Sequence, residues 1–109
     1  MPIAMMTYWA VSEQDACRRD YDEIHARIGF PDDPPQGLIV HSAGTTADGG
    51  WRIFEIWESR ERIEDFMAER LVPAWRELSG PSAPPPSTTE VTELHGLFLA
   101  PPAETEPRV

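Results

Sequence analysis

The sequence predicts an α+β fold, with two helices on one face of a four-stranded antiparallel sheet. Runs rich in aliphatic and aromatic residues occur at 3–11, 37–46, 51–59 and 90–100, and helix-patterned segments follow the first and third runs. An Asp-Gly pair lies between the second and third runs, which is typical of a hairpin. Strand, helix, hairpin, helix, strand is the ferredoxin-like βαββαβ arrangement. The chain has 109 residues, so we expect one such domain.

The first strand and helix are predicted from residue periodicity. Residues 3–11, IAMMTYWAV, are apolar on both alternating sets, which suits a strand covered on both faces. Ser12 can accept amide hydrogens as a helix cap, and Gly29 ends the helix. Between them an apolar stripe recurs every three or four residues, at Cys17, Tyr21, Ile24 and Ile28. The single cysteine cannot form an internal disulfide, and we expect a buried thiol rather than a nucleophile.

The middle of the chain predicts a hairpin followed by an irregular helix. The strands are GLIVHSAGTT and WRIFEIWES, joined by ADGG, whose glycines accept positive φ angles. Ser59 can cap the next helix, whose apolar stripe continues past Pro73. Because proline removes a backbone donor and clashes with the preceding turn, we expect a kink or short break near Val72.

The C-terminal part predicts a last strand and a tail. PSAPPPSTT should be extended, and EVTELHGLFLA, residues 90–100, should be the fourth strand. PPAETEPRV has almost nothing to bury. We therefore expect a domain over residues 1–99 and a disordered tail over 100–109.

The apolar residues of the central strands predict a homodimer. Residues 3–11 and 51–57 carry large apolar side chains on both faces, while two helices cover only one face. Burying one such side chain contributes roughly 1.5 to 3 kcal/mol, so several exposed ones would exceed the stability of a small domain. A second copy of the chain would cover the open face.

Charge and motif content exclude several classes of function. Nine basic and nineteen acidic residues give a formal charge of −10, which disfavours nucleic acid and anionic membranes as partners. The first residues have no basic region of a signal peptide, so we expect a cytoplasmic protein. The sequence has no HExxH, CxxC, GxGxxG, Walker or GxSxG motif. We therefore expect no cofactor and no metal, while a haem or metal site built across a dimer stays open.

The stretch GGWRIFEIWESRERIEDFMAERLVPAW resembles the dimeric α+β barrel proteins, and among them the antibiotic biosynthesis monooxygenase-like group. GLIVHSAG and ELHGLFL fit the neighbouring strands, so the resemblance covers about residues 3–99. It implies a homodimer whose two sheets pack face to face. It says less about chemistry, because related proteins include cofactor-free oxygenases, haem-degrading enzymes, cyclases, isomerases and proteins without known activity.

Three polar residues in apolar strands are candidates for proton transfer: His41, His95 and Glu55. A carboxylate in an apolar cavity suits a base, but Glu55 would equally suit an ion pair at the dimer contact. The two histidines lie on opposite edge strands and would line one cavity from two sides, or form structural hydrogen bonds. The candidate substrate-binding residues are Tyr8, Trp9 and Trp57, together with Trp51. Each of the four could instead anchor the core or an interface. His25 is expected at the surface or boundary.

Two functions remain open on the sequence alone. One is an enzyme that holds a small, mostly apolar, aromatic or polyketide-like molecule between sheet and helices, for cofactor-free oxygenation or cyclisation. The other is a homodimer that binds a ligand or supports another protein without catalysis.

Overall fold

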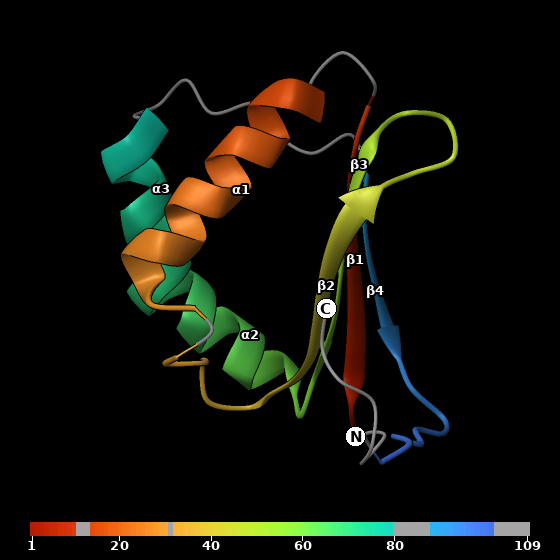
Figure 1. Cartoon of the computed structure of the whole chain (residues 1–109). Coiled ribbons are helices and arrows are strands. Elements are labelled where there is room, and N and C mark those ends of the chain that lie inside the picture. The colour runs from red at the N-terminus through yellow and green to blue at the C-terminus, as the bar shows by residue number, and fades with distance from the viewer. Residues whose placement is uncertain (11–13, 31, 80–87, 102–109) are drawn as a thin grey trace.

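The computed structural model describes residues 1–10, 14–30, 32–79 and 88–101. Figure 1 shows the predicted two layers, with all helices on one side of a single four-stranded sheet. The strand order is β2-β3-β1-β4 with antiparallel neighbours, so the ferredoxin-like prediction is confirmed. The strands are β1 (Ile3–Trp9), β2 (Leu38–Thr45), β3 (Trp51–Trp57) and β4 (Thr88–Glu93).

The predicted hairpin joins β2 to β3. Gly49 has a φ of 88°, a left-handed conformation that glycine adopts at little cost because it has no Cβ. The pairing places Thr45 opposite Trp51 and His41 opposite Glu55, with an irregularity between Leu38 and Val40. This register decides which side chains of the edge strand face the helices.

The first helix, α1 (Gln14–Ile28), ends where the sequence predicts. Gly29 follows it with a φ of 88° and donates to the carbonyl of His25 at 3.0 Å. The guanidinium of Arg70 donates to the carbonyl oxygens of Ile28 and Asp33, which fixes the turn after the helix. The predicted cap at Ser12 and the buried thiol of Cys17 lie outside the described residues and side chains.

The second helical segment is continuous but irregular. It consists of α2 (Arg60–Phe66), a π-helical turn η2 (Met67–Leu71) and α3 (Val72–Ser79). The predicted cap is confirmed, because Ser59 Oγ accepts the backbone N–H of Arg62 at 3.3 Å. The irregularity predicted near Val72, a kink or short break, takes the form of a wider π turn over Met67–Leu71, just before Pro73, whose ring would otherwise meet the carbonyl of Glu69.

The last strand is shorter than predicted and is displaced along the sequence. It starts at Thr88 and ends at Glu93, so residues 94–100 are not in a strand and His95 lies beyond the sheet. The reason lies in β1, whose first residue Ile3 pairs with Glu93. Pro2 accepts one more bond, from the Leu94 N–H at 2.9 Å, but has no N–H to return, so the ladder stops. Residues 102–109 of the predicted tail lie outside the described residues, and the domain boundary stays a prediction.

The two faces of the sheet have different surroundings. The helix-facing set includes Ile3 and Trp57, which pack with Ile63 and Phe66 in a core where Trp57 is fully buried. A second cluster, Trp9 and Trp51, packs against Tyr21 and Trp75 at the other end of the same layer. The space between the clusters, under α1, is where the polar strand residues meet. Within the described chain, no helix is long and apolar enough to span a membrane.

Candidate functional site

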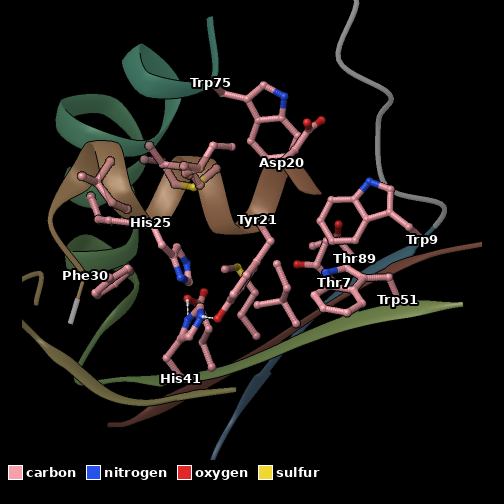
Figure 2. A pocket seen from close by; sticks show the side chains of 18 residues that line it. Thr7, Trp9, Asp20, Tyr21, His25, Phe30, His41, Trp51, Trp75 and Thr89 are labelled. Atoms are coloured by element: carbon pink, nitrogen blue, oxygen red, sulfur yellow. Dashed lines mark hydrogen bonds and ion pairs between the residues drawn. The ribbon is translucent and has the colours of Figure 1, made fainter. Parts of the chain in front are cut away.

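A cavity of about 210 Å³ lies between the sheet and the helices. Its floor comes from β1, β2 and β3, with Thr89 of β4 at one side, and its roof from α1, α2, η2 and α3. Most of its surface is apolar or aromatic, and Figure 2 shows the rings of Trp9, Trp51, Trp75, Tyr21 and Phe30 around it. Its polar lining includes His41 on β2 and Glu55 on β3, three α1 residues (Asp20, Tyr21 and His25), and the threonines Thr7 and Thr89 on β1 and β4. Such a cavity suits a small apolar molecule oriented by a few polar contacts.

Three side chains form a continuous hydrogen-bonded chain on the cavity wall. Glu55 Oε2 lies 2.7 Å from His41 Nδ1, and His41 Nε2 lies 2.7 Å from the Tyr21 hydroxyl. Glu55 is 5% exposed, and its other oxygen accepts the indole N–H of Trp57 at 3.3 Å. Glu55 and His41 are partners in the β3–β2 ladder, and Tyr21 reaches them from α1 (Figure 2). Two of the three candidates for proton transfer, His41 and Glu55, thus line the same cavity and contact each other.

With Glu55 ionised and His41 neutral, one arrangement of protons satisfies every donor and acceptor in this chain. An ionised Glu55 carboxylate accepts only, so His41 Nδ1 carries the proton between them. In the neutral imidazole, Nε2 then has a lone pair and accepts the Tyr21 O–H. Glu55 thus orients the ring so that the basic nitrogen of His41 faces the cavity.

Burial and neighbouring charge hold Tyr21 and His25 in their neutral forms. Burial, with the negative charge of Glu55 as the next cause, raises the pKa of Tyr21 to about 12. Burial, followed by the positive charge that His41 can carry, lowers the pKa of His25 from 6.5 to about 4. The rings of His25 and His41 have centroids 4.9 Å apart. At neutral pH the cavity therefore presents a phenol and a neutral imidazole beside the His41–Glu55 pair.

The other predicted site residues lie in different places. Trp9 lines the cavity and stacks on Trp75, with ring centroids 6.3 Å apart. Trp57 does not line the cavity; it lies in the core beneath it, packs against Phe66 with ring centroids 5.3 Å apart, and donates to Glu55. Tyr8 is on the opposite face, where its hydroxyl donates to Asp48 at 2.8 Å, and His95 is exposed beyond β4. Roles for Tyr8, Trp57 and His95 in binding or catalysis stay predictions from the sequence.

Sequence reasoning missed the contribution of α1. His25 was expected at the surface or boundary and is half-buried, but it also lines the cavity next to Tyr21, with ring centroids 3.8 Å apart. Tyr21 was assigned only to the core stripe. The spacing of four residues between them was the available signal, because it places both on the same helix face.

The donor set does not suggest a metal centre. Among the described residues, no three His, Cys, Asp or Glu side chains are arranged so that they could hold an ion.

No family model and no curated protein matches the sequence, whereas solved structures match the fold. A structure of a candidate antibiotic biosynthesis monooxygenase from Chloroflexus aurantiacus has a TM-score of 0.63 at 13% identity, over 90% of this chain and 97% of that one. Another such structure, from Deinococcus radiodurans, has a TM-score of 0.60 at 16% identity, over 92% of this chain and 98% of that one. The structure of a protein of unknown function from Nitrosomonas europaea has a TM-score of 0.62 at 16% identity, over 92% of this chain and 95% of that one. The chain thus has the α+β fold of antibiotic biosynthesis monooxygenase-like proteins.

Proposed function

We propose that the protein binds a small, flat, mostly apolar molecule in this cavity and removes a proton from it. The observation that carries the proposal is the Tyr21–His41–Glu55 chain, which directs a basic imidazole nitrogen into an apolar space. A carboxylate that holds the opposite ring nitrogen also stabilises the imidazolium formed when His41 takes a proton. The substrate would carry an acidic O–H or an activated C–H, and its hydrogen would replace Tyr21 as the partner of Nε2.

Deprotonation makes an aromatic or polyketide-like molecule electron-rich, and such an anion reacts with O₂ without a cofactor. In the simplest balanced reaction an activated methylene becomes a ketone, one oxygen atom enters the product and the other leaves as water. The names of the structural neighbours are consistent with this class of reaction. A cyclisation would start from the same carbanion and needs no O₂.

The test is exchange of the activated methylene hydrogens of β-tetralone for deuterium, followed by NMR in D₂O, with O₂ uptake measured in parallel. Wild type should accelerate exchange, and His41→Phe, which keeps a flat ring, should reduce the acceleration by about 10² to 10⁴-fold. Ser42→Ala, at the exposed residue next to His41 that faces away from the cavity, is the control and should exchange as wild type does. Equal exchange by wild type and His41→Phe would refute His41 as the base.

The second candidate function is ligand binding without catalysis. It is favoured by one observation: the hydrogen bonds of His41 are already satisfied by Tyr21 and Glu55. In that case β-naphthol binds, measured by quenching of tryptophan fluorescence, but wild type does not accelerate exchange.

We also propose that the protein acts as a homodimer. Figure 1 shows no helix on the outward face of the sheet, which carries Met6, Val40 and Phe54. Beyond β4, Phe98 is 85% exposed and Leu99 55% exposed. Apolar groups in these positions suit contact with a second copy of the chain.

A further inference from the structure

His25 is a half-buried residue of the cavity wall whose ring nitrogens have no hydrogen-bond partner within the described part of the chain. The imidazole is held there by contacts with the rings of Tyr21, Phe30 and His41. Among the described residues, the only buried side-chain nitrogens or oxygens without a partner are two tryptophan indole nitrogens. The nitrogens of His25 are therefore not enclosed by protein, and a bound molecule can contact them.

The ring of His25 faces the proposed base. The ring centroids of His25 and His41 lie 4.9 Å apart, with planes at 60°, and in Figure 2 the ring of His25 points from α1 towards His41. Both rings line the cavity of about 210 Å³, and both also line a second hollow of about 310 Å³ beside the edge strand β2. Two rings at this separation can contact neighbouring atoms of one small molecule.

His25 keeps an N–H without carrying a charge. Burial and the positive charge that His41 can carry lower its pKa to about 4, although the exposed Asp22 acts in the opposite direction. A neutral imidazole has one N–H in either tautomer, so His25 can donate a hydrogen bond at neutral pH. A positive charge at this place would reduce the proton affinity of His41, whereas a neutral donor leaves it basic. Neutral histidine is known to polarise a substrate carbonyl in this way.

We infer that His25 is a second catalytic residue, whose N–H donates to the carbonyl oxygen next to the carbon that His41 deprotonates. This rests on the proposed function and restricts its substrates to compounds with an acidic C–H beside a carbonyl. The C–H bond breaks, its electron pair forms the C=C bond of an enolate, the carbonyl π electrons go to the oxygen, and the proton goes to Nε2 of His41. Because negative charge on the oxygen grows in the transition state, the hydrogen bond from His25 is stronger there than in the ground state.

Tyr21 is the other hydrogen-bond donor at this place. Its hydroxyl lies 2.7 Å from Nε2 of His41, and its raised pKa of about 12 keeps the phenol protonated. The two donors differ in the free protein, because the Tyr21 hydroxyl already has a partner and must leave it before it can bind a substrate oxygen. The N–H of His25 breaks no bond when it donates, which favours His25 as the donor to the enolate oxygen.

The test is the rate of hydrogen exchange of β-tetralone in D₂O, measured by NMR over a range of substrate concentrations. His25→Phe keeps the ring contacts and should lower kcat for exchange by about 10²-fold with little change in KM, as loss of an oxyanion donor does. His25→Gln restores an N–H donor and should recover about 10-fold of this loss. Tyr21→Phe should lower kcat less than His25→Phe does. Glu23→Gln, an exposed change on the same helix, is the control and should exchange as wild type does.

Thermal unfolding followed by circular dichroism shows whether each variant is folded, and His25→Leu replaces His25→Phe if the latter does not fold. The inference is wrong if the folded variant exchanges as fast as wild type, if it raises KM alone, or if Tyr21→Phe loses more. The proposed function then survives, provided that His41→Phe loses the acceleration. If wild type does not accelerate exchange, the proposed function fails and the inference fails with it.

Discussion

Acidification should destabilise the fold through His25. Its pKa is 6.5 when unfolded and about 4 in the folded protein, so the folded state favours the neutral ring. The stabilisation from this residue is complete above pH 6.5 and is lost as the pH falls towards 4. Full conversion at about 1.4 kcal/mol per pKa unit would give roughly 3 kcal/mol. Because the ring is only half-buried, solvent screening reduces this to about 1 to 2 kcal/mol.

The assay is urea unfolding of wild type and His25→Phe at several pH values between 7 and 4. Phenylalanine suits the site, because His25 lies between the rings of Tyr21 and Phe30, with centroids 3.8 and 4.7 Å away. The carboxylates titrate in both proteins, so the difference between them isolates His25. Wild type should lose about 1 to 2 kcal/mol more than the variant over this range. Parallel losses would show that His25 is not held neutral by its surroundings.

Two other predictions concern the buried carboxylate and the oligomer. Glu55→Ala should lower the free energy of unfolding by about 3 kcal/mol, because it leaves the donors of His41 and Trp57 unpaired. Glu55→Gln should lower it by about 1 kcal/mol. Equal losses for the two variants in urea titrations would contradict this. The oligomer is tested by light scattering after size exclusion at micromolar concentration. Wild type should have twice the chain mass of 12.3 kDa, whereas Phe54→Asp should have the mass of one chain. A wild-type monomer would refute the dimer.

Most element boundaries could be predicted from the sequence because neighbouring residues determine them. The Asp-Gly turn, the cap at Ser59 and the glycine after Ile28 each fix a boundary through backbone geometry that neighbouring residues supply. The end of β4 has no such cause. It depends on Pro2, near the other end of the sequence, which ends the partner strand and has no N–H to continue the ladder.

For a related reason, the sequence predicted some residues of the site but not how they contact one another. Glu55 and His41 stood out as polar residues inside apolar strands, but their contact depends on the β2–β3 register and on the irregularity between Leu38 and Val40. A slip of one residue would turn His41 to the outward face. Tyr21 and His25 could join them only once α1 was placed over these strands, and helix periodicity alone does not say which strand a helix covers.

Glu55 is the residue that stability explains least. It lies in the centre of β3 on the face packed against the helices, where an apolar side chain would fill the space without any need for hydrogen-bonding partners. Replacing a buried charged group and its partner together by apolar residues is often neutral or stabilising, although removing one partner alone is costly. A network of this kind therefore contributes little net stability that an apolar core would lack. Its position on the cavity wall, where it orients the ring of His41, fits the proposed binding and proton transfer better than a role in stabilising the fold.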